Sequence, residues 1–259
     1  MTGRTSQLPA FLGLTFALTW LAWGLANPGL QRALGISIPP WLLIGLGTAV
    51  PSMVALAMAV RQGTADTLLA RLFHWRVHPG WYVVAILGPA VLMLAATAGH
   101  VLLGGTVPPY PPPSRWPLVA INFVIVLLVG GPLGEELGWR GLALPVLQDG
   151  LGLLTAALVI GIIWAVWHLP LFLLPGSPQS ELPWGWFALQ TVALSLVLSL
   201  VYEKTGHSLL LPVLLHTSVN TFSGPLRVLP SVAGSERPFI VTALLAWVAA
   251  GLLAVLTRR

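Results

Sequence analysis

Long apolar runs separated by short polar connections dominate this chain. A helix that crosses a bilayer needs about 20 apolar residues, and runs of roughly this length predict eight transmembrane helices. They fall at residues 9–26, 41–60, 81–104, 117–131, 152–174, 184–202, 207–223 and 238–256. The fourth and seventh runs are short and contain or adjoin Gly130-Gly131-Pro132 and Pro212, a pattern typical of irregular backbone that lines a cavity. We therefore predict an all-α, polytopic membrane protein, a single integral membrane domain over residues 1–259 with its helices around a polar intramembrane cavity.

The basic residues in the connections predict the orientation of the chain. With the N-terminus in the cytoplasm, seven bases outside the motifs fall inside and four outside. The inner set is Arg4, Arg61, Arg71, Arg76, Lys204, Arg258 and Arg259, and the outer set is Arg32, Arg115, Arg227 and Arg237. This excess favours a multi-pass protein of the cell membrane with both termini in the cytoplasm. The first run is long for a signal peptide and lacks a small-x-small cleavage site, so we interpret it as a retained helix.

Two connections have a pattern of their own. One predicts a short cytoplasmic helix in the headgroup layer, with an ordinary basic loop as the alternative. Its apolar positions, Leu68, Leu69, Leu72 and Phe73, repeat at helical spacing while Arg71, His74 and Arg76 take other faces. The other, residues 108–113, reads Pro-Pro-Tyr-Pro-Pro-Pro and predicts a stiff polyproline-type stretch on the outer side.

Composition narrows the class of protein further. Hydrophobic residues make up 56% of the chain and charged residues 7%, which excludes an ordinary soluble protein. The formal net charge is +5, but the bases are scattered in short connections, so the lipid bilayer with its anionic lipids is the expected partner and nucleic acid is not. The chain has no cysteine, which removes disulfides, thiolate nucleophiles and thiolate metal ligands. Composition leaves open whether the protein is a monomer or a homo-oligomer.

Glu135 and Glu136 are two of only seven acids in the chain and lie at membrane depth, where a charge is costly and therefore indicates function. Pro132 suits the first position of a helical segment, whose free amides favour a carboxylate. Two adjacent carboxylates titrate as a coupled pair. Glu136 and Arg140 are four residues apart, so we expect Arg140 to tether Glu136 and leave Glu135 free for chemistry. A buried salt-bridge cluster that only fixes helix packing is the alternative.

Two further polar motifs lie on later apolar runs. Trp164 precedes His168 by four residues, so its ring is expected to wall off the imidazole, and Pro170 should kink the helix just beyond the histidine. His216 and Asn220 are also four residues apart and stack on one helix face as a donor and acceptor pair. Taken singly, each motif is more often a packing or interhelical hydrogen-bond element than a catalytic one.

The conjunction of these motifs points to catalysis. Glu135, His168, His216 and Asn220 come from three separate segments, and we expect them to meet at one partly hydrated cavity. A carboxylate and an imidazole that hold one water make a general base, and a second imidazole with a carboxamide can stabilise an oxyanion. We favour this metal-free arrangement, which requires no cofactor. In the alternative, His168, His216 and Glu135 hold a catalytic zinc ion.

The strings Glu135-Glu136-x-x-x-Arg140, Trp164-x-x-x-His168 and His216-x-x-x-Asn220, in this order, resemble the CAAX-protease and bacteriocin-processing (CPBP) intramembrane protease family, related to type II CAAX prenyl endopeptidases. The resemblance covers a motif-bearing core at residues 117–225, and its most specific part is the first string extended by Gly141 and Leu142. The family's middle motif usually begins with Phe, from which Trp164 departs.

This resemblance implies an eight-helix fold with a conical cavity open to the cytoplasm and the membrane. It also implies that Glu135 and His168 activate water, that His216 and Asn220 bind the oxyanion, and that Glu136 and Arg140 support them. The expected activity is that of a glutamate-type intramembrane endopeptidase, or a zinc-dependent one in the alternative. Its substrate would be a peptide or protein in or at the membrane, with lipidated and CAAX-like C-terminal peptides as candidates.

Two other functions compete with this interpretation: a non-catalytic membrane scaffold or immunity protein, and a proton-coupled transporter that uses the same charged groups as a relay. Other intramembrane proteases fit poorly. Ser208 lacks a complete Gly-x-Ser-x-Gly element, and Asp66 and Asp149 both fall in connections, so neither a serine nor an aspartyl type is indicated.

Overall fold

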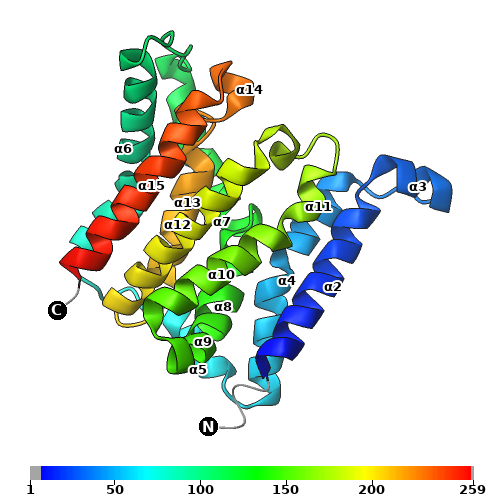
Figure 1. The fold of residues 1–259 in the computed structure, drawn as a ribbon. Coiled ribbons are helices and arrows are strands. Elements are labelled where there is room, and N and C mark those ends of the chain that lie inside the picture. The colour runs from blue at the N-terminus through cyan, green and yellow to red at the C-terminus, as the bar shows by residue number, and fades with distance from the viewer. Residues whose placement is uncertain (1–6, 258–259) are drawn as a thin grey trace.

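The computed structural model describes residues 7–257, and within that range the chain forms helices and no strands, which confirms the predicted all-α class. Figure 1 shows long helices side by side, joined by short connections. The α-helices are α2 (Gln7–Leu25), α3 (Pro28–Leu34), α4 (Pro40–Arg61), α5 (Ala65–Leu72), α6 (Gly80–Leu102), α7 (Trp116–Val129), α8 (Pro132–Gly138), α9 (Leu144–Leu151), α10 (Leu153–Trp167), α11 (Leu169–Phe172), α12 (Trp184–Lys204), α13 (Leu210–Phe222), α14 (Pro230–Ala233) and α15 (Arg237–Leu256). Short turns of other helix types are η1 (Pro113–Arg115), η2 (Trp139–Ala143) and η3 (Pro178–Glu181).

Among the described residues, seven segments are long and apolar enough to cross a membrane, and the shorter α13 is a further apolar helix. Each of the eight predicted runs overlaps one of these segments, so the multi-pass architecture is confirmed. The fourth segment is longer than predicted. It covers Pro113–Leu151, because helical structure resumes at Pro132 after a break at Gly130 and Gly131.

A proline in the middle of α4 is accommodated by α2. Pro51 has no N–H, so the carbonyl of Gly47 loses its partner within the helix. Thr19 Oγ1 of α2 donates a hydrogen bond to this carbonyl at 3.0 Å. A Cβ at Gly47 would lie 2.4 Å from Nε1 of Trp23, so only glycine allows α2 to pack this closely. The two helices therefore pack in close contact at this point.

The same helix α4 holds α8, which carries both motif glutamates. A Cβ at Gly134 would lie 2.8 Å from Cα of Ala49, and a Cβ at Gly138 would lie 2.7 Å from the carbonyl oxygen of Pro51. Backbones thus meet directly along this contact, as small residues permit between membrane helices. The position of α8 is fixed by backbone packing.

Helix α10, which carries Trp164 and ends just before His168, is fixed by α12 in the same way. A Cβ at Gly161 would lie 2.8 Å from Cα of Val192, and Ser195 Oγ donates to the carbonyl of Ala157 at 2.8 Å. Both contacts anchor the helix within about two turns of the motif.

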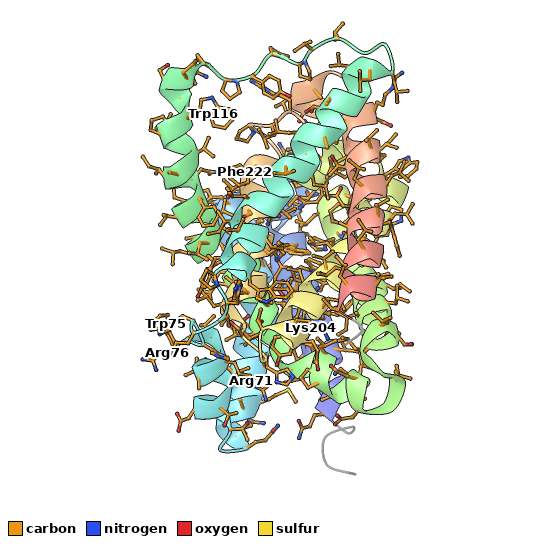
Figure 2. The ribbon with its side chains drawn as sticks, turned by 90° about the vertical axis from the view of Figure 1, so that its left-hand side faces the viewer. Arg71, Trp75, Arg76, Trp116, Lys204 and Phe222 are labelled. Atoms are coloured by element: carbon orange, nitrogen blue, oxygen red, sulfur yellow. The ribbon has the colours of Figure 1, made fainter. Side chains whose placement is uncertain are left out.

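Helix α7 differs from its neighbours, because it has no buried residue along its 14 residues. Figure 2 shows Trp116, at its beginning, near the edge of the molecule. The helix ends before Gly130, and Gly131 has a φ of +111°, which a side-chain-bearing residue rarely adopts. The chain then enters α8, which is mostly buried.

The beginning of α2 and the end of α15 lie at the same side of the molecule as α5 (Figure 1). We call this side the α5 end. Of the seven bases behind the predicted orientation, Arg4, Arg258 and Arg259 lie outside the described residues. The N-in, C-in orientation therefore stays a prediction.

The two distinctive connections take the expected local structure. The short basic helix is present as α5, which begins one turn earlier than the predicted apolar stripe and ends at Leu72. Phe73, His74 and Arg76 lie beyond its end in non-helical chain, so the helix is confirmed only for the first part of the stretch, and its place in the headgroup layer stays a prediction. In the proline-rich connection, Pro112 has φ −63° and ψ 154°, a polyproline-type conformation.

Candidate active site

Both motif glutamates are buried in α8, with exposed fractions of 3% for Glu135 and 0% for Glu136. The helix begins at Pro132, as predicted from the sequence. The positive φ of Gly131 turns the chain directly before it, and a Cβ there would lie 2.6 Å from Oε1 of Glu135. A glycine at this position therefore leaves room for the carboxylate.

Glu136 is held from two sides. Nη1 of Arg140, one helical turn later, lies 3.0 Å from each carboxylate oxygen, which confirms the predicted tether. Nδ1 of His216, from α13, lies 2.9 Å from Oε1. Because a carboxylate that binds an arginine accepts hydrogen bonds, Nδ1 of His216 is the donor. Glu136 therefore sets the orientation of an imidazole 80 residues away in sequence.

Glu135 is not free, contrary to the expectation from the helix spacing. The indole Nε1 of Trp164 donates to its Oε2 at 2.6 Å. Spacing along α8 correctly separates Glu135 from Arg140, but it gives no information on a donor from another helix. The same indole also lies under Arg140, whose Cζ is 4.8 Å from the ring centroid, in a cation–π contact.

His168 lies where α10 ends. α10 stops at Trp167 and α11 begins at Leu169, so the predicted break near Pro170 is confirmed and falls at the histidine itself. Nδ1 of His168 lies 2.8 Å from the backbone carbonyl of Trp164, and since a carbonyl only accepts, Nδ1 carries the hydrogen. In the neutral ring the lone pair is then on Nε2.

Aromatic rings surround the His168 imidazole. The Trp164 ring, the predicted wall, has its centroid 5.8 Å away. Trp167, Phe187 and Trp23 add centroids at 4.8, 5.1 and 6.1 Å. Only 8% of His168 is exposed. These further rings come partly from α2 and α12, and no periodicity within one helix could have indicated them.

His216 and Asn220 do not form the predicted pair. The buried His216 bonds to Glu136, whereas Asn220 is exposed and its side chain makes no hydrogen bond to the described residues of the cluster. A carboxylate is a stronger acceptor than a carboxamide, which explains the exchange of partners. The structure thus brings together Glu135, Glu136, Arg140, Trp164, His168 and His216, and leaves Asn220 one turn beyond them on α13.

Residues 7–257 contain no group of three His, Asp or Glu side chains placed to hold a metal ion. Nδ1 of His168 and Nδ1 of His216 are both engaged by protein acceptors. Both imidazoles keep Nε2 open, as metal-ligating histidines also do, so these contacts do not separate the zinc alternative, with His168, His216 and Glu135, from the metal-free arrangement. Both stay predictions, and we assign no chemical step to a metal.

One feature of the motif has no counterpart in the sequence prediction. Residues Trp139–Ala143 form a π-helical turn, η2, which contains the motif arginine Arg140. Pro145 follows and has no N–H to continue the normal pattern. Turns of this kind are frequent at functional sites because they redirect side chains. The proline one turn after the arginine is the only signal that could have indicated it.

Comparison with known proteins supports the resemblance seen in the motifs. Residues 115–222, which include all three motifs, match the family described as type II CAAX prenyl endopeptidase Rce1-like. A curated relative, CAAX prenyl protease 2 of Methanococcus maripaludis, is 30% identical over 146 residues. That match covers 53% of this chain and 53% of the relative, so the matched part spans about half the length of the curated protein. The suspected resemblance to this protease family is thereby confirmed.

Proposed function

We propose that this protein, a multi-pass membrane protein whose central part is similar to type II CAAX prenyl endopeptidases, is an intramembrane endopeptidase. One observation carries the proposal. Trp164 binds Glu135 through its indole N–H and His168 through its backbone carbonyl, so a carboxylate of α8 and the imidazole that follows α10 are held by the same residue. A carboxylate and an imidazole in one buried site are the groups that activate a water molecule.

In the proposed mechanism, a water molecule donates hydrogen bonds to Glu135 and to Nε2 of His168. The water attacks the carbonyl carbon of the scissile peptide bond as one of its protons passes to the general base that Glu135 and His168 form together. The tetrahedral intermediate collapses when the same proton is given to the leaving amine, and the C–N bond breaks. The products are an amine and a carboxylic acid, which releases its remaining proton to solvent and becomes a carboxylate.

The negative oxygen of the intermediate would be bound by α13. His216 donates to Glu136 through Nδ1, so it can donate through Nε2 only when the ring carries both protons. The buried Glu136 provides the counter-charge for that form. Asn220, one turn further, has two N–H donors and no partner in the cluster to compete for them. We assign it to the oxyanion on this basis, as the family resemblance also implies.

The experiment uses the full chain reconstituted in lipid with peptides that carry varied C-terminal tails, each with and without a lipid attached. Cleavage is followed by mass spectrometry for the wild type, Glu135→Gln and His168→Ala. Glu236→Gln, which changes an exposed acid at the start of α15, is the matched control. We expect cleavage by the wild type and the control, and its loss in both site variants.

The outcome also separates the competing functions. Cleavage that survives Glu135→Gln and His168→Ala would refute the mechanism. Substrate-dependent proton flux without cleavage would identify a transporter, and neither activity would leave the scaffold or immunity function. The lipid-bearing and lipid-free peptides in the same assay define the substrate class, which is a peptide or protein at the membrane in every version of the proposal.

A further inference from the structure

A basic and aromatic segment runs from the last turn of α5 to the start of α6 and takes no part in the proposed site. It covers residues 71–79, and its Phe73 and Trp75 side chains are 70% and 61% exposed. Arg71 is half-buried and Arg76 is exposed. The sequence contains no acid between Asp66 and Glu135, so the segment itself contributes no carboxylate, and Glu203 of α12 is the acid near Tyr202, the partner of Arg71.

Hydrogen bonds fix the first half of the segment to the chain around the start of α13. Nη1 of Arg71 donates to the hydroxyl of Tyr202 at 3.0 Å, and the carbonyl of Arg71 accepts from the backbone N–H of Leu209 at 2.9 Å. Ser208 Oγ donates to the carbonyl of His74 at 2.7 Å. The segment is therefore an ordered surface, and Arg71 is presented with its guanidinium oriented.

The second half is ordered as well. The hydroxyl of Tyr82, in the first turn of α6, donates to the carbonyl of Trp75 at 2.6 Å. Cζ of Arg76 lies 5.2 Å from the centroid of the Trp75 ring, so the guanidinium stays next to an exposed indole. Figure 2 shows Arg71, Trp75 and Arg76 at the same end of the molecule as Lys204, the last residue of α12.

The neighbouring helices indicate the depth of this segment in the membrane. α4 ends at Arg61, α6 begins at Gly80 and α12 ends at Lys204, so three long apolar helices stop at this level. The segment leads into α6, is joined to α4 through α5, and is hydrogen-bonded to α12 through Arg71 and Tyr202. It therefore lies at the boundary between hydrocarbon and headgroups, where exposed aromatic rings and arginines are favourable.

We propose that this segment is a binding site for the phosphate headgroup of an anionic phospholipid. The exposed Arg76 binds the phosphate, for which the guanidinium fork is well suited, and the half-buried Arg71 adds positive charge to the same surface. The exposed Phe73 and Trp75 side chains enter the hydrocarbon next to the headgroups. A zwitterionic lipid carries its own ammonium group, which the two arginines repel. The site therefore selects a lipid with net negative charge.

The test is a lipid titration of the purified full chain in a neutral detergent. Native mass spectrometry measures the Kd of the first bound phosphatidylglycerol and of the first bound phosphatidylcholine. The variants are Arg76→Gln and the double variant Arg71→Gln/Arg76→Gln. Arg115→Gln is the matched control, because it removes an exposed arginine next to an exposed tryptophan, Trp116, away from the α5 end.

We expect the wild type and Arg115→Gln to bind phosphatidylglycerol equally well and more tightly than phosphatidylcholine. Each arginine near a charged lipid surface contributes about fivefold, so the single variant should bind about fivefold more weakly and the double variant about 25-fold. If the double variant fails to fold, Arg76→Gln alone carries the test, since its described ring contact is with an exposed residue. Equal binding of the two lipids by the wild type, or equal losses in Arg76→Gln and Arg115→Gln, would overturn the proposal. Peptide cleavage does not enter this measurement, so it is independent of the enzymatic proposal.

Discussion

Replacing Trp164 by phenylalanine keeps an aromatic ring in the site and removes one specific hydrogen bond. The indole N–H of Trp164 reaches Glu135 at 2.6 Å, a short bond to a carboxylate inside the protein. Hydrogen bonds to charged groups contribute about 1.5–3 kcal/mol. If this bond holds Glu135 in position for the attack on the peptide, its loss lowers kcat by roughly 10- to 150-fold, since about 1.4 kcal/mol is a factor of ten.

A matched control is available in the adjacent motif. Trp139 is fully buried like Trp164, but its indole N–H has no hydrogen-bond partner among the described residues. Trp139→Phe therefore removes the same atoms and leaves a similar cavity without the loss of a hydrogen bond. Both variants should unfold at lower temperature than the wild type, as large-to-small changes in a core do.

The assay is the steady-state cleavage of the best peptide from the library, with the unfolding temperature measured on the same preparations. We expect kcat to fall in Trp164→Phe with KM nearly unchanged, because the hydrogen bond that is lost acts on the catalytic carboxylate. Trp139→Phe should keep kcat within about a factor of two, far below the loss expected for a charged hydrogen bond. Equal losses of kcat in the two variants would refute the reasoning, because they would trace the effect to packing.

Three more outcomes follow from the site. Gly131→Ala should reduce kcat, because its Cβ would lie 2.6 Å from Oε1 of Glu135. Gly35→Ala is the control, because Gly35 also has a positive φ but no atom within 4 Å of an added Cβ. Equal activity of the two variants would contradict the argument. Arg140→Met should lower the free energy of unfolding by about 3–5 kcal/mol, because it leaves Glu136 buried without its cation. The double change Arg140→Met/Glu136→Gln should recover part of this stability in chemical unfolding, and strictly additive losses would show that the two residues act independently. Strong chelation should leave cleavage unchanged in the metal-free mechanism, and activity lost to the chelator and restored by zinc would show that mechanism to be wrong.

The sequence predicts what depends on one helix at a time. The apolar runs indicate the transmembrane helices, Pro132 marks the start of α8, and the four-residue spacing of Glu136 and Arg140 places them in contact, because each of these features follows from local geometry. Pro170 likewise indicates that the helix is interrupted near His168.

Patterns within a single helix do not predict the contacts between helices. Trp164 and Glu135 are 29 residues apart and His216 and Glu136 are 80 apart, and helical periodicity says only which face a side chain occupies, not which neighbour it meets. For the same reason the sequence paired His216 with Asn220, the one polar residue three or four positions from it on α13. The competition from a buried carboxylate on another helix decided the pairing.

The length of α7 has a consequence for the lipid around it. With 14 residues and no buried side chain, the helix presents a hydrophobic belt about 21 Å tall before the chain turns inward at Gly130 and Gly131. A bilayer has a hydrocarbon core about 30 Å thick, so the mismatch compresses the adjoining leaflets or draws headgroups and water inward. An extended peptide resting against this flank would meet a thinner barrier, which lowers the cost of bringing its polar backbone to the depth of the buried carboxylates.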